Sequence, residues 1–220
     1  MGKYDVILWD FDGTLAYTGK DVWNSLEYAA AECGGTFPKA FVENDSNLGL
    51  SVMEIYRQLD PYPGEKNFLR FDALVTRHYR ELSDYNDTYL YPGILETIHQ
   101  ISENGLKQYI ITMKPQEALE RILMKKGWES LFDGWYSPDS FDDRDRTKSE
   151  LISHVIAETG AKKYIYLGDT WSDIAASREN HIDSIAITYG DGETRLLLEQ
   201  NPTFVADNAF EIGKILGIGE

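Results

Sequence analysis

The sequence has very little cysteine and no long apolar run. Cys33 is its one cysteine, so no internal disulfide can form, and such sparse use is typical of a reducing compartment. No apolar run approaches the roughly 18 residues of a membrane-spanning helix, and no basic and apolar signal pattern is visible near the N-terminus. We therefore expect a soluble, cytoplasmic protein.

Positive charge is also scarce. The chain has 21 lysines and arginines against 37 aspartates and glutamates, which gives a formal net charge of −16. A surface of this sign repels nucleic acids and anionic membranes, so neither is an expected partner. A small anionic substrate is still compatible with it, because a few local cations can override the overall field. The 42% hydrophobic content is enough for a sizeable core and argues against disorder.

Short apolar runs that alternate with longer segments of helical period indicate the fold class. Four runs are predicted as buried strands, namely Tyr4 to Trp9, Lys107 to Thr112, Tyr164 to Leu167 and Ser184 to Thr188. Between them, apolar residues recur at helical spacing, as in Ile94, Ile98 and Ile101. We predict an α/β fold with a doubly wound, mainly parallel sheet that helices cover on both faces.

One interval breaks this alternation. From about Ala16 to Tyr89 the sequence has helical candidates and no convincing buried strand, with a proline-rich turn at Asp60 to Gly64. We predict a helical domain at residues 16–89, inserted after the first strand of an α/β core formed by residues 1–15 and 90–220. The polar stretch from Ser137 to Thr147 is predicted as a surface loop of this core.

Two aspartates follow the first predicted strand. Asp10 and Asp12 are at positions i and i+2, so an extended strand end would point both carboxylates the same way. Carboxylates so close repel each other unless a cation or a shared proton relieves them. Gly13 permits a sharp turn, and Thr14 offers a hydroxyl and a nearby amide to an oxyanion. Taken alone, this motif fits catalysis and helix capping equally well.

A second pair of aspartates follows the strand predicted at Tyr164 to Leu167. Asp169 and Asp173 are four residues apart, so both can reach one face of a helix that begins there. A helix cap with an acid in its first turn is the plainer interpretation of this pair alone. Two acidic pairs at one carboxyl edge of a parallel sheet favour a ligand site instead. Oxygen ligands favour Mg²⁺ over Zn²⁺, so we predict a magnesium site that involves Asp10, Asp12, Asp169 and Asp173.

Two further residues are candidates for the same site. Lys148 opens a helix after the polar loop and is the natural counter-charge to the carboxylates, although a lysine at a helix start is most often solvated. Thr112 closes the second predicted strand, where an ordinary strand-end residue is the alternative interpretation. Both gain weight because the aspartate pairs are predicted at the same sheet edge.

These features together resemble the four motifs of the haloacid dehalogenase superfamily in order, spacing and strand context. The matching residues are Asp10-Phe11-Asp12-Gly13-Thr14, then Ile111-Thr112, then Lys148, then Gly168-Asp169 with Asp173. The resemblance spans Tyr4 to about Gly190, and the helical insert is similar to the α-helical cap of that superfamily. Looser likenesses, such as Tyr91-Pro92-Gly93, resemble its phosphoglycolate phosphatase-like members.

The resemblance implies a catalytic role for the first two aspartates. Asp10 would be the nucleophile that forms an aspartyl-phosphate, and Asp12 would be the general acid and then the general base. Dehalogenases of the superfamily lack the second acid, so the presence of Asp12 favours phosphoryl transfer over carbon–halogen cleavage.

The resemblance also implies two binding sets. The phosphate ligands would be Thr112, Lys148, Gly13 and Thr14. The Mg²⁺ ligands would be Asp10, the main-chain carbonyl of Asp12 and Asp169, with Asp173 acting through water. Magnesium would offset charge on both the nucleophile and the phosphoryl group.

Several alternatives stay open at the level of sequence. The leading hypothesis is a phosphatase whose partner is a small phosphorylated metabolite, such as phosphoglycolate, a sugar phosphate, a nucleoside monophosphate or pyrophosphate. A phosphomutase of the β-phosphoglucomutase kind would share the same motifs, and a domain that binds phosphate without turnover is the third hypothesis. Tyr17, Trp23, Arg57 and Lys66 are candidates for substrate contact, with core or solvated positions as the plainer interpretation. No oligomeric state is predicted.

Overall fold

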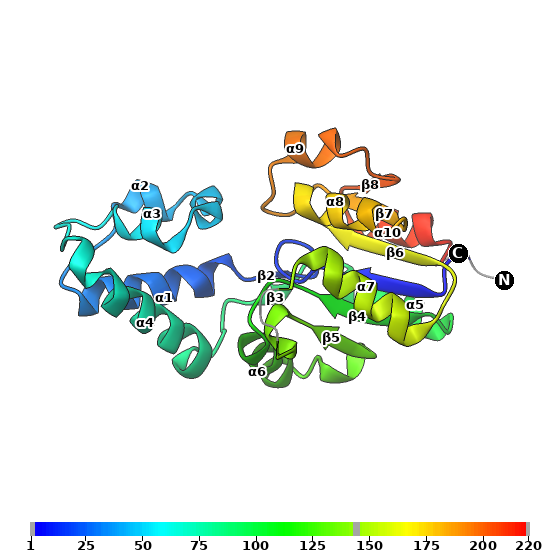
Figure 1. The fold of residues 1–220 in the computed structure, drawn as a ribbon, viewed down its shortest axis with the longest axis horizontal. Helices are drawn as coiled ribbons and strands as arrows, with labels where there is room; N and C mark the ends of the chain where they lie inside the picture. The colour runs from blue at the N-terminus through cyan, green and yellow to red at the C-terminus, as the bar shows by residue number, and fades with distance from the viewer. Residues whose placement is uncertain (1–2, 143–145, 219–220) are drawn as a thin grey trace. The chain divides into compact units, whose positions relative to one another are not determined.

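The computed structural model of the protein describes residues 3–142 and 146–218. The chain forms two compact units, one made of Met1–Tyr17 with Tyr89–Glu220 and the other of Thr18–Thr88 (Figure 1). Residues 143–145 of the predicted surface loop lie outside the described residues, and the part before them includes a short 3₁₀ turn, η5 (Pro138–Ser140). No helix within the described ranges is long and apolar enough to cross a membrane.

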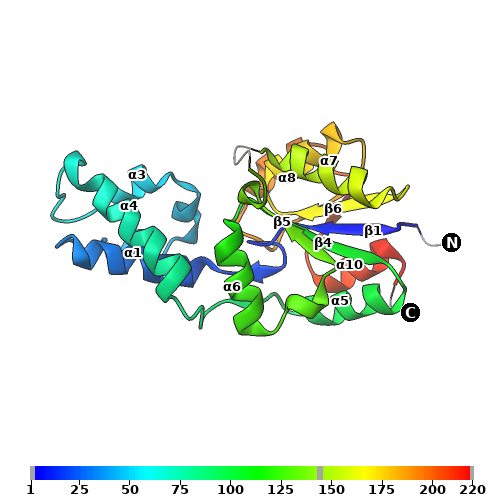
Figure 2. The same cartoon turned by 60° about the horizontal axis from the view of Figure 1, so that its bottom comes forward.

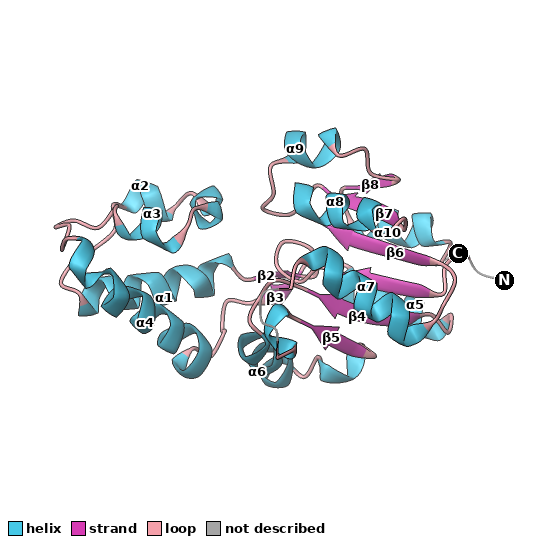
Figure 3. Ribbon diagram, in the orientation of Figure 1, coloured by secondary structure: helices cyan, strands magenta, loops and turns pink. Residues whose placement is uncertain are grey.

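A six-stranded parallel sheet forms the centre of the first unit (Figure 3). Its strands lie in the order β5 (Gly134–Tyr136), β4 (Lys107–Ile111), β1 (Val6–Trp9), β6 (Tyr164–Gly168), β7 (Asp183–Ile187) and β8 (Phe204–Ala206). Every adjacent pair is parallel. The strand order reverses at β1, as it does in a doubly wound sheet. The predicted α/β fold class is confirmed.

Helices cover both faces of this sheet (Figure 2). One face carries α7 (Lys148–Thr159), α8 (Trp171–Glu179) and α9 (Thr194–Glu199). The other carries α5 (Ile94–Glu103), α6 (Gln116–Lys126) and α10 (Ala209–Leu216). A 3₁₀ turn, η4 (Glu129–Leu131), follows α6. Because both faces are covered, the central strands are apolar along their whole length, which is why the sequence predicts them.

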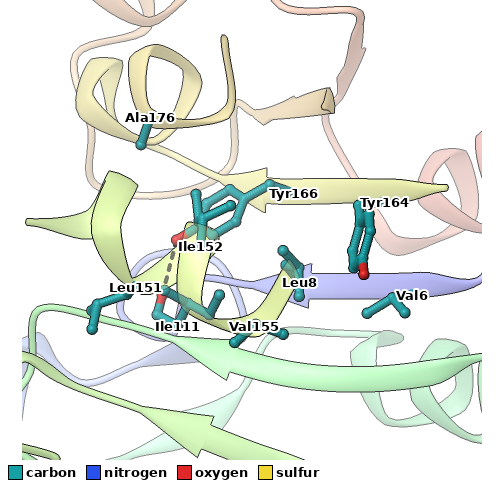
Figure 4. Packing of buried hydrophobic residues seen from close by; sticks show 9 residues of the cluster. All are labelled: Val6, Leu8, Ile111, Leu151, Ile152, Val155, Tyr164, Tyr166 and Ala176. Atoms are coloured by element: carbon teal, nitrogen blue, oxygen red, sulfur yellow. Dashed lines mark hydrogen bonds between the residues drawn. The ribbon is translucent and has the colours of Figure 1, made fainter. Parts of the chain in front are cut away.

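The side chains between the sheet and α7 form a close-packed core (Figure 4). Leu8 from β1 and Ile152 from α7 are fully buried there. Tyr166 lies in the same cluster, and its hydroxyl donates a hydrogen bond of 2.9 Å to the main-chain carbonyl of Ile111. This buried polar bond joins β6 to the end of β4, so the packing fixes the two strand ends that carry candidate site residues.

The strands that the sequence analysis missed are short or half-exposed. β5 and β8 have three residues each and lie at the two edges of the sheet, where one side of each strand is unpaired. β2 (Ala16–Tyr17) and β3 (Tyr89–Leu90) form a two-stranded antiparallel sheet of their own in the first unit. Segments of two or three residues are too short to show an apolar period.

The second unit is helical. Its elements are α1 (Gly19–Glu32), α2 (Lys39–Val42), η1 (Asp45–Gly49), α3 (Val52–Tyr56), η2 (Glu65–Asn67), α4 (Phe68–Arg77) and the π-helical turn η3 (His78–Leu82). Trp23 is 3% exposed in its core, with ring centroids 6.0 Å from Phe37 and 5.7 Å from Phe41. Trp23 is therefore a core residue of this unit, which was the plainer interpretation of it.

A buried carboxylate ties together the two ends of the second unit. Asp21, in the first turn of α1, is 3% exposed. Its Oδ2 accepts hydrogen bonds from the Asp87 N–H at 3.1 Å and from the Thr88 hydroxyl at 2.8 Å. Lys20 also pairs with Asp87 at 2.6 Å, at an exposed position where an ion pair contributes little. The buried carboxylate is therefore the stronger of the two ties.

Replacing this carboxylate should loosen the end of the unit. Asp21→Ala leaves the Asp87 N–H and the Thr88 hydroxyl without their buried acceptor, which should cost about 2–3 kcal/mol. Amide hydrogen exchange should then speed up across residues 84–88 and the first turn of α1. Glu27→Gln, an exposed change on the same helix, is the matched control and should leave exchange unchanged. Equal exchange in Asp21→Ala and the wild-type protein would contradict this account.

Candidate active site

The candidate residues meet at the carboxyl edge of the parallel sheet in the first unit. Asp10 follows β1, Thr112 follows β4 and Asp169 follows β6. These strands are neighbours, and β1 is where the strand order reverses. This edge is where doubly wound sheets bind ligands, because strands diverge there and the loops are free to vary.

A loop of tight main-chain bonds sets the position of the first motif. The Asp10 N–H donates to the Leu167 carbonyl at 2.8 Å, which continues the ladder between β1 and β6 by one residue. The chain then turns back on itself, with the N–H groups of Leu15 and Ala16 both donating to the Phe11 carbonyl. Gly13 lies inside this turn with a φ of +74°, a backbone conformation that residues with a side chain rarely adopt.

Three buried carboxylates come together at this edge. One oxygen from each of Asp10, Asp169 and Asp173 lies within 4.8 Å of the other two. The three residues are 5%, 2% and 0% exposed. The structure therefore brings together three of the four aspartates that the sequence analysis proposed for metal binding.

Lys148 supplies the positive charge among these carboxylates. Its Nζ is 3.1 Å from Asp10 Oδ1, and it also forms an ion pair with Asp173. The residue is the first of α7, and the preceding Thr147 caps that helix in a reciprocal box with Glu150. The cap fixes where α7 begins, so it also fixes the point from which the Lys148 side chain reaches the cluster.

Asp173 holds its orientation through further donors besides Lys148. The Thr170 N–H and hydroxyl both donate to its Oδ2, at 2.9 Å and 2.6 Å. The Tyr166 hydroxyl, whose proton goes to the Ile111 carbonyl, lies 3.3 Å from Oδ1. Asp173 is thus both a helix-capping residue, as its plainer interpretation proposed, and a member of the carboxylate cluster.

Asp169 lies in a cradle made of backbone. The N–H groups of Asp191 and Gly192 each donate to its Oδ2 at 3.0 Å, and the Thr14 hydroxyl lies 3.4 Å from its Oδ1. A Cβ at Gly13 would lie 2.2 Å from Asp169 Oδ2, and one at Gly190 would lie 2.2 Å from the Gly13 carbonyl oxygen. Glycine is required at both positions because the carboxylate and the turn approach so closely.

Asp12 has a different partner from the buried cluster. Its carboxylate Oδ1 lies 3.0 Å from the Nζ of Lys114, and its side chain is 38% exposed. Asp10 and Asp12 therefore form ion pairs with two different lysines.

The remaining candidates take positions beside these groups. Thr112 is 1% exposed, and its hydroxyl accepts a hydrogen bond of 3.1 Å from the Lys114 N–H. Thr14 is fully buried, and its carbonyl accepts a hydrogen bond of 2.7 Å from the Tyr189 hydroxyl. Each of these contacts keeps a polar group of the candidate site in a fixed position.

Burial dominates the electrostatics of the cluster. It raises the pKa of Asp10 well above its usual range; the charge of Lys148 acts in the opposite direction, and Asp173 and Asp169 add to the rise. Burial, followed by the charge of Asp173, raises the pKa of Asp169 to about 7. Burial works against the charged ammonium of Lys148, but the carboxylates of Asp10 and Asp173 outweigh it and raise that pKa.

These residues fit a divalent cation. If all three carboxylates are ionised, one ammonium leaves two negative charges uncompensated in a buried site, and such charges are costly. The ligand atoms that these residues offer are all oxygens, and they lie within 4.8 Å of one another, so one ion can contact more than one of them. A hard cation such as Mg²⁺ matches this set better than Zn²⁺, which prefers nitrogen and sulfur.

Some residues around the site were given no role from the sequence, although Lys114 belongs to the segment Thr112-Met113-Lys114-Pro115, which resembles phosphoglycolate phosphatase-like proteins. Three residues contact a candidate residue, namely Lys114, Tyr166 and Gly192. Lys114 and Gly192 follow predicted strands, and Tyr166 lies one residue before the end of another. Lys114 could have been found from its place two residues after Thr112. The contact between Gly192 and Asp169 joins segments 23 residues apart, so no local pattern indicates it.

Comparison with known proteins places the chain in a family. A model of the family described as haloacid dehalogenase-like hydrolase matches residues 7–187. The chain therefore belongs to the haloacid dehalogenase-like hydrolase family.

Individual relatives are similar to the chain over most of its length. The chain is 25% identical over 211 residues to a phosphoglycolate phosphatase of Pseudomonas syringae pv. syringae (strain B728a), covering 92% of this chain and 76% of that protein. It is 25% identical over 213 residues to a 5'-nucleotidase of Pseudomonas aeruginosa, covering 94% and 93%. A solved structure of a haloacid dehalogenase-like family hydrolase from Streptococcus pneumoniae matches with a TM-score of 0.80 and 22% identity, covering 97% of this chain and 98% of that one. These comparisons confirm the resemblance to the haloacid dehalogenase superfamily. They also confirm the enzyme class that it implied, a phosphoric monoester hydrolase.

The glycine that packs against Asp169 should not tolerate a side chain. In Gly190→Ala the added Cβ would lie 2.2 Å from the Gly13 carbonyl and 2.5 Å from Asp169 Cβ, so the turn or the carboxylate must move. We expect a loss of stability of about 1–3 kcal/mol, measured by urea unfolding. Gly49→Ala is the control, because its Cβ would meet nothing within 4 Å. Equal unfolding midpoints for the two variants would show that the cradle is looser than described.

Metal binding should stabilise the protein more as the pH rises. The pKa of Asp169 is about 7 in the folded chain, above its ordinary value of 3.8, so folding favours the protonated carboxyl. Without metal, the stability from this group is complete below about pH 4 and is lost as the pH rises through about 7. Mg²⁺ at about 100 times its dissociation constant should raise Tm by roughly 5–10 °C at pH 8, and by much less at pH 5.

Differential scanning calorimetry with Mg²⁺ or EDTA measures this shift. Asp169→Asn removes one of the carboxylates and should abolish most of the difference between pH 5 and pH 8. A Tm shift of the same size at both values, or one that survives in Asp169→Asn, would argue against metal binding at this cluster.

Proposed function

We propose that the protein is a Mg²⁺-dependent phosphatase that hydrolyses a small phosphate monoester through a phosphoryl group carried by Asp10. The observation that carries this proposal is that Asp10 and Asp12, at the edge of the sheet, each form an ion pair with a different lysine. Asp10 is buried beside Lys148 and two further carboxylates. Asp12, two residues later, lies outside that group and forms an ion pair with Lys114. A nucleophile and an acid–base group need this kind of separation, because their environments must differ.

In the first half of the proposed reaction, a carboxylate oxygen of Asp10 bonds to phosphorus as the bond from phosphorus to the ester oxygen breaks. The departing oxygen takes a proton from the Asp12 carboxyl, so the product leaves as a neutral alcohol. The Asp12 side chain is 38% exposed, which suits a group that must meet the leaving group of a substrate arriving from solvent.

In the second half, a water oxygen bonds to phosphorus and the acyl-phosphate bond to Asp10 breaks. Asp12, now a carboxylate, takes a proton from that water, and inorganic phosphate leaves. Asp10 is returned as a carboxylate and Asp12 as an acid, so the protein ends the cycle as it began.

The neighbouring residues would bind the phosphoryl oxygens. We assign this role to the Lys148 ammonium, the Thr112 hydroxyl, and the main chain or hydroxyl around Gly13 and Thr14. Mg²⁺, held by Asp10, the Asp12 carbonyl and Asp169, with Asp173 acting through water, would offset the charge of nucleophile and phosphoryl group as they approach.

The substrate class follows from chemistry that the relatives share. Phosphoglycolate and nucleotides are both small phosphate monoesters, and proteins named for acting on them are the relatives described above. We propose a small phosphorylated metabolite of this kind, handled in the cytoplasm, where a chain with one cysteine stays reduced.

We further propose that residues 16–89 form a cap that selects the substrate. Support comes from the second unit, Thr18–Thr88, which is helical and has its own core. Arg57, a candidate for meeting an anionic group, pairs with Glu65 at 2.7 Å, so a substrate would have to compete with that carboxylate.

Removing the nucleophile should abolish turnover. Wild-type protein with Mg²⁺ should hydrolyse p-nitrophenyl phosphate and at least one member of a panel of phosphorylated metabolites. Asp10→Asn should reduce kcat by about 10⁴-fold or more, because the amide cannot form the phosphoryl ester. Asp72→Asn, a half-buried change in the second unit, is the matched control and should keep wild-type kcat on p-nitrophenyl phosphate.

Two results would redirect this proposal. Phosphoryl transfer to a glucose phosphate in preference to water would favour a phosphomutase. No turnover on the whole panel, with Mg²⁺ still bound, would favour a domain that binds phosphate without catalysis.

A further inference from the structure

Two lysines are buried in the described part of the chain, and one of them has no role in the mechanism above. Lys114 and Lys148 are each 9% exposed, whereas the other described lysines are half-buried or exposed. An ammonium that leaves water loses its hydration, so it is retained only beside a partner that compensates. For Lys148 the partners are Asp10 and Asp173. For Lys114 a partner is Asp12, at 3.0 Å.

The backbone around Lys114 holds its starting point firmly. Its N–H donates to the Thr112 hydroxyl at 3.1 Å, so the residue is anchored to the end of β4. Pro115 follows with a φ of −54°, and α6 begins at Gln116, whose N–H donates to Asp139 at 2.9 Å. The side chain is 6% exposed, so its methylene stem is packed along its length.

Asp12, in contrast, is the more exposed member of the pair. Its side chain is 38% exposed, and it lies on a turn whose next residue, Gly13, has a φ of +74°. A half-exposed carboxylate on a turn would sample several rotamers unless something holds it. The buried ammonium of Lys114 is the more rigid partner, so it determines the orientation of Asp12.

We infer that Lys114 is the positioning residue for the acid–base carboxyl of Asp12. The inference rests on the proposed function and adds a residue that acts through Asp12. The ammonium contacts Oδ1 of the carboxyl directly, so moving it changes how Asp12 faces the leaving group and the attacking water. The two aspartates also pair with separate cations, since Lys148 contacts Asp10 and Lys114 contacts Asp12.

Such a role has a kinetic signature that a structural or substrate-binding role lacks. Release of p-nitrophenolate needs no proton, because this leaving group is stable as an anion at neutral pH, so it should be insensitive to Lys114. Hydrolysis of the phosphoryl-enzyme needs a base to take a proton from water, so it should depend on Lys114 through Asp12. A misplaced acid–base group can slow a reaction by about 10²-fold.

The test is a double-mutant cycle on these two steps. Rapid quench with ³²P-labelled p-nitrophenyl phosphate and Mg²⁺ measures phosphoryl-enzyme formation and its decay in wild type, Lys114→Met, Asp12→Asn and the double variant. Lys114→Met should slow decay about 10- to 100-fold. It should leave both the formation rate and the substrate dissociation constant, read from the concentration dependence of formation, within about threefold. In the Asp12→Asn background, Lys114→Met should slow decay no further, because the residue acts through Asp12.

Controls separate this inference from the function on which it rests. Lys162→Met, an exposed change in the same unit, should match wild type, and circular dichroism verifies that each variant is folded. If Lys114→Met does not fold, Lys114→Arg, which keeps the charge, and Lys114→Gln, which does not, take its place. Arginine should then preserve more of the decay rate than glutamine.

Other outcomes would overturn the inference. Equal slowing of both steps, a raised KM with an unchanged decay rate, or slowing of the same size in the Asp12→Asn background would each contradict a positioning role. If wild-type protein forms no phosphoryl-enzyme, the proposed function itself is wrong. If it does, and Lys114→Met matches it in decay, only the inference about Lys114 is wrong.

Discussion

The buried contact of Lys148 with Asp10 and Asp173 is the interaction on which the rest of the site depends. Carboxylates that close together in an apolar setting repel one another, and one ammonium offsets only part of their charge. With all three carboxylates ionised, the site keeps an excess of negative charge that a divalent cation would relieve. In the proposed function, a divalent cation beside Asp10 would also offset the charge of an incoming phosphoryl group.

The fold delivers these groups through short local devices at strand ends. The box at Thr147 fixes the start of α7 and hence Lys148, and the Thr170 cap fixes Asp173 at the start of α8. The glycine turn at Gly13 and the N–H groups of residues 191 and 192 hold Asp169. Each device satisfies a backbone group that the end of a strand or helix would leave unpaired, so positioning and stability arise from the same bonds.

The sequence predicted the central part of this arrangement because the relevant patterns are local. β1, β4, β6 and β7 are apolar runs ending in polar residues, and Asp10, Asp169 and Lys148 stand directly after a strand or at a helix start. What it missed depends on contacts between distant segments or on strands of two or three residues. Neither the pairing of Asp12 with Lys114 nor the cradle around Asp169 has a periodic signal, because each forms only when the sheet brings its strand ends together.

The central claim is that Asp10 carries the phosphoryl group, and mapping that group on the chain tests it most directly. Wild-type protein would be mixed with Mg²⁺ and a phosphate monoester that it turns over, quenched in acid, digested with pepsin at low pH and analysed by mass spectrometry. We predict added phosphate on a peptide that contains Asp10, with fragment ions that place it on that residue, and none in Asp10→Asn. Phosphate on any other side chain would contradict the account. Turnover without a phosphorylated peptide, in samples quenched before the phosphoryl-enzyme is hydrolysed, would contradict it as well.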